Sequence, residues 1–113
     1  MTVQIKGKKG EHMAKLISKH VGIITSIQPT EWVENMEEWA WRKKYENFLG
    51  IIHIYQSKRK NPSQYFLAAY DLELDCLTTG IGKLTYEDEL LTLKTRNSIY
   101  TVKLIYTDEK AGE

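Results

Sequence analysis

Two short segments of the chain mix aromatic rings with positive charges. Residues 39–45 read WAWRKKY and residues 55–61 read YQSKRKN, so that each segment carries three cations. Proteins hold single-stranded nucleic acid with this mixture, because cations attract phosphates and rings stack on bases for about 1–3 kcal/mol each. We therefore predict a nucleic-acid-binding surface. Its expected residues are Trp41, Arg42, Lys43, Lys44, Lys58, Arg59 and Lys60.

A plainer interpretation of these segments stays open. Tryptophan is mostly buried in folded proteins, so the tryptophans could belong to the core while the lysines keep a loop soluble. The chain carries 16 Lys and Arg against 15 Asp and Glu, a net charge of +1. Any attraction for nucleic acid must therefore come from a local patch.

Motifs for nucleophilic and phosphate chemistry are not recognisable. The stretch Gly80 to Lys83 is too short for a phosphate-binding loop. Cys76 follows an acid, whereas reactive thiols need an electropositive setting, so we expect a small buried residue there. Asp71, Glu73 and Asp75 alternate as a solvated strand face would. We expect the protein not to be an enzyme.

Metal ligands would have to come from three histidines and the single cysteine. His12, His20, His53 and Cys76 show no zinc-finger spacing. We expect no metal and no cofactor. His53 lies in the middle of an apolar run, and we expect it to be partly buried and hydrogen-bonded.

The clearest strand pattern runs from Gln64 to Cys76. Apolar residues recur there at every second position, as on the buried face of a strand: Phe66, Ala68, Tyr70, Leu72, Leu74 and Cys76. Residues 51–55 form a second β-branched and aromatic run. The two strands are predicted to pair as an antiparallel hairpin with a basic tip at 58–63.

The C-terminal part predicts another hairpin. Residues 90–95 and 99–106 flank Arg96-Asn97-Ser98, and asparagine and serine favour turns. The returning strand has an apolar face made by Tyr100, Val102, Leu104 and Tyr106. We expect the two hairpins to share a core, with these members: Tyr70, Leu72, Tyr100, Val102 and Leu104.

The first half of the chain is more ambiguous. Residues 21–27 predict a strand, and residues 11–19 either a helical turn or a continuation of that strand. Thr30 could cap a short helix at about 30–37, with one face made by Trp32, Met36, Trp39 and Ala40. Trp39, Trp41, Lys43 and Tyr45 also alternate, which predicts a strand from about residue 38.

These elements fit one domain spanning residues 1–113. Six or so strands with one or two short helices predict an α+β, mostly β fold: a small antiparallel barrel or rolled sheet. A single cysteine favours the cytoplasm. The N-terminus lacks the apolar run of a secretion signal, and no apolar stretch approaches the roughly 20 residues that span a bilayer, so we expect no membrane association.

Four short stretches together resemble a known family. They are Gly22–Ile27 (GIITSI), Asn47–Gly50 (NFLG), Tyr70–Asp75 (YDLELD) and Thr95–Tyr100 (TRNSIY). They look like the PrgU-like small regulatory proteins carried by enterococcal, Gram-positive conjugative plasmids. The resemblance implies a PUA-like β-fold, RNA binding and negative control of conjugation genes. It transfers no binding residue to this chain.

The function expected from these observations is that of a non-catalytic regulatory protein. It would bind RNA through the basic and aromatic surface and control gene expression of a mobile element. The alternative is a protein-interaction module or homodimer that binds no nucleic acid.

Overall fold

The computed structural model describes residues 14–57, 64–71 and 76–108. They form seven strands and one helical segment. The strands are β1 (Ala14–Pro29), β2 (Phe48–Ser57), β3 (Gln64–Tyr70), β4 (Cys76–Thr78), β5 (Gly82–Glu87), β6 (Leu90–Thr95) and β7 (Ser98–Asp108), and the helical segment comprises α2 (Met36–Trp39) and the 3₁₀ helix η1 (Ala40–Tyr45).

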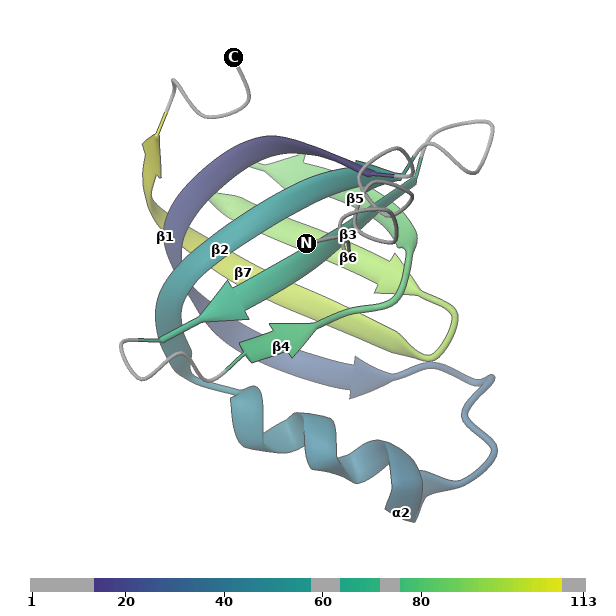
Figure 1. Cartoon of the computed structure of the whole chain (residues 1–113). Coiled ribbons are helices and arrows are strands. Elements are labelled where there is room, and N and C mark those ends of the chain that lie inside the picture. The colour runs from purple at the N-terminus through teal and green to yellow at the C-terminus, as the bar shows by residue number, and fades with distance from the viewer. Residues whose placement is uncertain (1–13, 58–63, 72–75, 109–113) are drawn as a thin grey trace, which may run out of the picture.

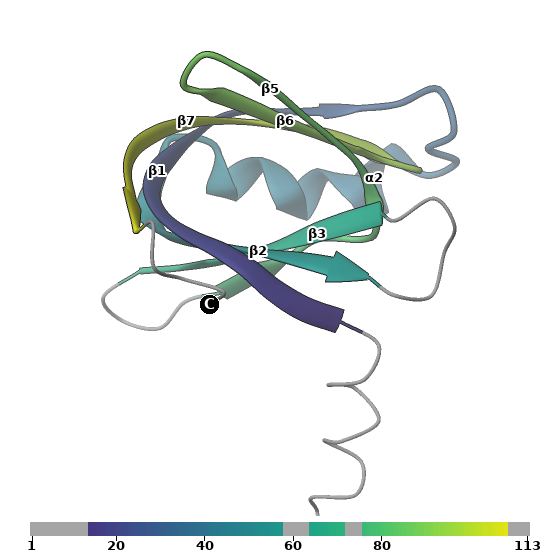
Figure 2. The same ribbon diagram turned by 90° about the horizontal axis from the view of Figure 1, so that it is seen from above.

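The strands form one antiparallel sheet that rolls into a ring (Figure 1). Its order is β2-β1-β7-β6-β5-β3-β4, and an additional pairing between β2 and β3 closes the ring. The joint between β3 and β5 is narrow, with the single pair Tyr65 and Gly82. Figure 2, turned by 90°, shows the helical segment lying across one end of the ring. The predicted mostly β, antiparallel rolled sheet with a short helix is therefore confirmed.

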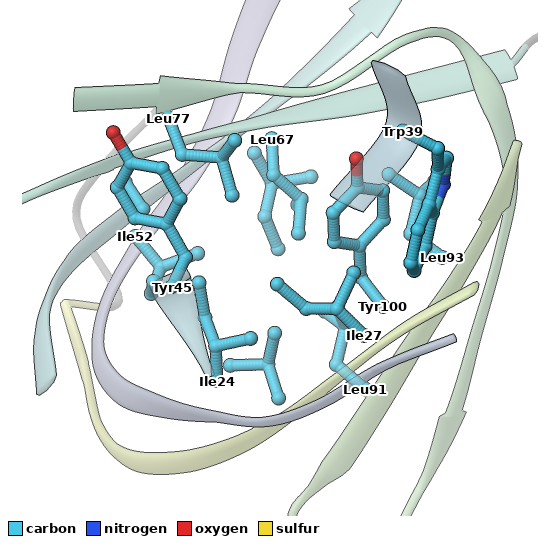
Figure 3. Close-up of a cluster of buried hydrophobic side chains, with 13 residues drawn as sticks. Ile24, Ile27, Trp39, Tyr45, Ile52, Leu67, Leu77, Leu91, Leu93 and Tyr100 are labelled. Carbon is cyan, nitrogen blue, oxygen red and sulfur yellow. The ribbon is translucent and has the colours of Figure 1, made fainter. Parts of the chain in front are cut away.

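The core fills the inside of this ring (Figure 3). Its side chains come from β1, β2, β3, β4, β6, β7 and the helical segment. Those buried most completely are Ile24, Ile27, Ile52, Ile54, Leu91, Leu93 and Val102. On each strand they recur at roughly every second residue, because successive side chains of a strand point to opposite faces.

The predicted C-terminal hairpin is confirmed. Strands β6 and β7 pair from Leu90 with Lys103 to Lys94 with Ile99, around the expected turn. Tyr100 and Val102 are buried, and Leu104 packs against the core. The hairpin could be predicted because its turn chemistry and its alternation are both local.

The predicted buried face of β3 is correct only for Ala68, which is buried. Leu67 and Ala69 enter the core, whereas Phe66 and Tyr70 lie on the outer face. Both alternating sets of this strand are apolar, so periodicity could not choose between them. The register decides, since Ala69 pairs with Ile52, which is fully buried. The predicted core residue Leu72 and its neighbour Leu74 lie outside the described residues.

The predicted continuous strand from 64 to 76 is also wrong. It divides into β3 and β4, which run antiparallel, with Tyr70 opposite Cys76. Antiparallel strands run in opposite directions, so Tyr70 and Cys76 belong to two strands and not to one. The backbone of Cys76 belongs to β4, and the expected inertness of its thiol stays a prediction.

Tyr106 does not share the buried face of β7 as predicted. Its neighbours on β1 show why: Val21 pairs with Tyr106, but Gly22 pairs with Leu104. Ile105 is therefore an extra residue in β7, and such a bulge shifts the inward and outward alternation by one position. Ile105 and Tyr106 are 57% and 64% exposed.

Two glycines face each other across β1 and β2. Gly22 pairs with Gly50. A Cβ atom added to Gly50 would lie 2.1 Å from the carbonyl oxygen of Tyr70 on β3. Only glycine lets the strands approach so closely here.

A buried histidine ties β1 to β7. His20 is 5% exposed, and its ring nitrogens lie 2.9 Å from Thr107 Oγ1 and 2.9 Å from Ser18 Oγ. Burial lowers the pKa of His20 below its usual 6.5, because a low-dielectric site disfavours the charged ring.

Candidate functional site

The helical segment begins at Asn35, not at Thr30 as predicted. The Asn35 side-chain oxygen accepts hydrogen bonds from the backbone N–H groups of Glu37 (3.0 Å) and Glu38 (3.2 Å). This is an N-cap, which satisfies donors that the first helical turn leaves unpaired. Thr30 instead organises the preceding loop: its Oγ1 accepts from the Trp32 N–H and donates to the Arg96 carbonyl.

Residues 38–45, predicted as a strand, are helical. Trp39 and Tyr45 are buried, whereas Trp41 and Lys43 are exposed. The two buried residues are six positions apart, which equals two turns of a 3₁₀ helix with three residues per turn. The alternating pattern of the sequence is thus a coincidence of residue types. The predicted helix face fails as well, because Trp32 and Met36 are exposed.

Trp39 fixes the helical segment to the β6–β7 hairpin. Its ring is 3% exposed, and Nε1 donates a 2.9 Å hydrogen bond to Oγ of Ser98, which is 1% exposed. A buried indole N–H needs such a partner. The plainer interpretation of the tryptophans as core residues is therefore correct for Trp39 alone, since Trp32 and Trp41 are 58% and 49% exposed.

Glu46 fixes the other end of the helical segment. Its Oε2 accepts the Ile27 backbone N–H at 2.9 Å and the Lys43 ammonium at 3.1 Å. The Ile27 hydrogen bond and then the Lys43 contact lower the pKa of Glu46, because both favour the ionised carboxylate. The segment is thereby held at both ends, so the residues between these ends have defined positions.

The β6–β7 turn brings a second arginine to the same region. The Thr30 N–H donates to the Asn97 carbonyl at 3.0 Å, which joins the turn to the loop before α2. The guanidinium carbon of Arg96 lies 6.0 Å from the centroid of the Trp32 ring. This distance is at the outer limit of a cation–π contact.

The loop, the helical segment and the turn line an open pocket of about 530 Å³. Trp32 and Trp41, both exposed, line it together with the buried Trp39. The Arg42 guanidinium lies 4.7 Å from the Trp41 centroid, and its Nη1 donates to the Trp39 carbonyl at 3.1 Å. We call this cavity the tryptophan–arginine pocket.

The lining of the tryptophan–arginine pocket also includes two acids, Glu34 and Glu38. Neither carboxylate pairs with a cation within the part of the chain that the structure describes. With Arg42 and Arg96 the pocket therefore presents two guanidinium groups and two carboxylates. It can contact a flat ring and exchange hydrogen bonds with both donors and acceptors.

The structure brings some of the predicted site residues together. Trp41 and Arg42 line the pocket. Lys43 and Lys44 follow them on η1 and are exposed. Lys43 pairs with Glu46, and Lys44 Nζ lies 5.2 Å from the Tyr45 ring centroid.

Lys58, Arg59 and Lys60 lie outside the described residues. Ser57, the residue before them, ends β2, whereas η1 precedes the start of β2. The contribution of these three residues to the binding surface therefore stays a prediction.

Sequence reasoning missed Arg96, Glu34 and Glu38 as possible site residues. Arg96 was assigned only to a turn, and it lies far along the chain from Arg42. No spacing rule connects a turn residue to a helix when only the folded sheet places them together. The sequence pattern predicts Trp32 as part of a helix face and not as a site residue.

A second surface stands out on the outer face of the sheet. Ile51 of β2, Val21 of β1 and Tyr106 of β7 pair in one row across three strands. Ile51 and Tyr106 are exposed, as are Leu49 and Ile105 nearby. Contiguous exposed apolar groups of this kind mark interaction surfaces. We call these residues the outer apolar face.

Aromatic rings extend the outer apolar face over β2 and β3. Tyr55 and Phe66 stack with centroids 5.0 Å apart, and His53 contacts Tyr70 at 5.1 Å. The sequence predicts a hydrogen-bonded His53, but its Nδ1 is buried without a hydrogen-bond partner among the residues that the structure describes. Burial and then the Lys19 charge lower the pKa of His53.

Comparison of the chain with protein-family models, with curated proteins and with solved structures gives no match. None of the helices among the described residues is long and apolar enough to cross a membrane. Within those same residues, no three histidine, cysteine, aspartate or glutamate side chains gather as a metal site would require. The site is therefore interpreted from its own geometry.

Proposed function

We propose that this protein is a non-catalytic regulator that binds single-stranded RNA at the tryptophan–arginine pocket. The observation that carries the proposal is the pairing of exposed rings with cations: Trp41 with Arg42 and Trp32 with Arg96 line one cavity. A base can stack on an exposed indole, and a guanidinium plane can extend the stack. Sequence-specific RNA recognition generally uses unpaired bases splayed onto aromatic side chains.

We assign phosphate attraction to the two lysines that follow Trp41 and Arg42 on η1. Lys43 and Lys44 are exposed on η1, next to Trp41 and Arg42. Lys43 shares its charge with Glu46, so Lys44 should contribute more. Under this proposal the pocket supplies stacking and the lysines of η1 supply charge, which suits a protein whose net charge is only +1.

The experiment is a titration of fluorescently labelled single-stranded RNA at two salt concentrations. Each phosphate contact with a single strand contributes roughly 0.7 to the salt slope. Lys44→Glu should weaken binding and lower the slope by about that amount. Trp41→Ala should weaken binding about 5- to 160-fold, nearly independently of salt, as expected for loss of one stacked base worth about 1–3 kcal/mol.

Lys83→Glu is the matched charge control, because Lys83 is exposed on β5 and is not among the described residues that line the pocket. It should leave the salt slope close to that of the wild type. Circular dichroism verifies that each variant is folded. Absence of binding by the wild type to varied RNAs at low salt would refute the proposal.

The role of the basic tip remains a separate prediction. Replacing Lys58, Arg59 and Lys60 together by glutamate should weaken binding and flatten its salt dependence if the tip holds phosphates. Unchanged affinity in the folded triple variant would remove the tip from the binding surface.

The biological setting is proposed from the resemblance to the PrgU-like group. Under that proposal the protein acts in the cytoplasm and reduces expression of conjugation genes by binding their RNA. Sequencing of RNA that copurifies with the protein from its host tests this directly, and enrichment of conjugation transcripts is the expected result.

The second candidate function is homodimerisation without nucleic-acid binding, and the outer apolar face favours it. Two copies could bury Ile51 and Tyr106 against each other, because sheets pack face to face at about 10 Å. Analytical ultracentrifugation tests this candidate. A dimer that dissociates in Ile51→Asp, together with RNA affinity that is absent, would select it over the first.

A further inference from the structure

The charges of the tryptophan–arginine pocket bear on what enters it. Arg42 and Arg96 are balanced there by Glu34 and Glu38. A phosphate inside the pocket would be drawn to the arginines and repelled by the carboxylates. A neutral ring that carries both donors and acceptors meets no such conflict. The pocket volume of about 530 Å³ falls within the range of about 300–1,000 Å³ typical of small-molecule sites. The pocket therefore has room for a whole purine base.

The hydrogen-bonding capacity of the lining narrows the choice of base. An ionised carboxylate only accepts hydrogen bonds, and a guanidinium only donates them. A matching base must therefore offer neighbouring donors on one edge and neighbouring acceptors on another. Guanine does so, with N1–H and the N2 amino group on its Watson–Crick edge and with O6 and N7 on its other edge.

The other bases match less well. Adenine has one amino group beside the acceptors N1 and N7, cytosine has one amino group beside N3, and uracil has one N–H between two carbonyls. None of them presents two adjacent donors to the two oxygens of one carboxylate. The bidentate fork of arginine, in contrast, fits O6 and N7 of guanine.

The local structure favours particular residues for these contacts. Glu38 lies in the first turn of α2, where its backbone N–H is bonded to Asn35, and the next residue, Trp39, is anchored in the core. Its backbone is thus held in place. Arg42 is already stacked on Trp41 and bonded to a backbone carbonyl. Arg96 has the longer contact, at 6.0 Å from the Trp32 ring, which leaves it freer to turn toward a ligand.

We propose that the tryptophan–arginine pocket accepts one guanine base of the bound RNA. Glu38 accepts hydrogen bonds from N1–H and the N2 amino group, Arg96 donates to O6 and N7, and Trp32 stacks on the ring. This inference rests on the proposed function, because it names the base that the same site selects.

The test compares labelled pentanucleotides that differ only at the central base, in a background of uridines. Guanine at the centre should bind about tenfold or more tightly than adenine, cytosine or uracil, since a bidentate contact discriminates by about 1–3 kcal/mol and a tenfold ratio corresponds to about 1.4 kcal/mol. Inosine, which lacks the 2-amino group, should bind several-fold more weakly than guanine.

Glu38→Gln should reduce the preference for guanine over adenine to near unity, because an amide offers one acceptor and one donor in place of two acceptors. Glu37→Gln is the matched control on the same helical turn, since Glu37 is not among the described residues that line the pocket. It should retain the preference. Affinity for the uracil-centred oligonucleotide serves as the readout that both variants are folded and still bind RNA.

The outcomes separate the two proposals. RNA binding with equal affinity for all central bases, or a guanine preference that Glu38→Gln leaves intact, overturns the guanine assignment and leaves RNA binding standing. Absence of binding to any oligonucleotide overturns both. Guanosine 5′-monophosphate that binds more tightly than the guanine-centred oligonucleotide assigns the pocket to a free nucleotide and overturns the assignment to RNA.

Discussion

The hydrogen bond between Trp39 and Ser98 holds the helical segment against the β6–β7 hairpin, and removing it is the most direct test of this role. Trp39→Phe keeps an aromatic ring in the core but removes the Nε1–H that donates to Ser98 Oγ. The unpaired hydroxyl is 1% exposed, and a buried polar group without a partner costs about 1–3 kcal/mol. The smaller ring adds about 1 kcal/mol through lost apolar burial. We expect the free energy of unfolding to fall by about 2–4 kcal/mol.

A double-mutant cycle isolates the hydrogen bond from the loss of ring volume. Ser98→Ala alone leaves the indole N–H unpaired, whereas the double variant removes both partners. The sum of the two single losses in free energy of unfolding should therefore exceed the loss in the double variant by about 1–2 kcal/mol, since the effects of contacting residues are not additive. Urea denaturation followed by circular dichroism measures each value, because tryptophan fluorescence would itself change.

Trp41→Phe is the control for this cycle. Trp41 is 49% exposed, so the same chemical change there should alter the free energy of unfolding by about 0.5 kcal/mol or less. If Trp39→Phe lowers the free energy of unfolding as little as the control does, Trp39 does not hold the helical segment in place. Strict additivity in the cycle would show that the hydrogen bond contributes nothing.

Three further predictions concern stability. Gly50→Ala places a methyl group 2.1 Å from a carbonyl oxygen of β3 and should cost about 2–3 kcal/mol in denaturation experiments; Gly80→Ala meets only an ordinary 3.9 Å contact and should cost far less. The lowered pKa of Glu46 means that its ionised form stabilises the fold above about pH 4.5 and that this contribution is lost as the pH falls through the folded-state pKa; the difference between wild type and Glu46→Gln in free energy of unfolding should be larger at pH 7 than at pH 3, and an unchanged difference would contradict the assignment. The lowered pKa of His20 means that the unfolded chain takes up a proton first as the pH drops below about 6.5; stability should therefore decrease from pH 7 to pH 5, and a His20→Gln variant with the same slope as the wild type would show that other groups are responsible.

Local patterns in the sequence were sufficient to predict the β6–β7 hairpin. Turn-forming residues at 96–98 and a one-sided apolar strand at Tyr100 and Val102 describe both the reversal and the buried face. The mostly β fold followed from the same kind of evidence, repeated along the chain. The one-sided apolar face of β7 was predicted correctly for Tyr100 and Val102, but not for Tyr106, which lies beyond the bulge.

Ambiguity arose wherever two local interpretations were equally apolar. In β3 both faces carry apolar residues, so the choice of Leu67 and Ala69 for the core depends on pairing with β2. In β7 the inserted residue Ile105 reverses the alternation only because of how β7 pairs with β1. Register is a property of two strands together, and a one-residue shift exchanges the faces.

The candidate site, too, was predictable from the sequence only in part. The aromatic and basic composition of residues 39–45 indicated Trp41 and Arg42, but it could not tell a helix from a strand there. The Asn35 cap and the buried hydrogen bond of Trp39 to Ser98 make the segment helical and expose Trp41. The sequence therefore predicted these two neighbouring site residues correctly, but it did not predict their helical conformation.

By itself the sequence determined the mostly β architecture, the C-terminal hairpin and part of the basic and aromatic segment, because these follow from alternation, turn chemistry and composition within a few residues. Only the tertiary structure decided which faces are buried, that residues 39–45 are helical, and that Arg96 stands beside Trp32 at the border of the same pocket as Arg42. The physical reason is that these relations are set by strand register and by closure of the sheet, which join segments far apart in the chain.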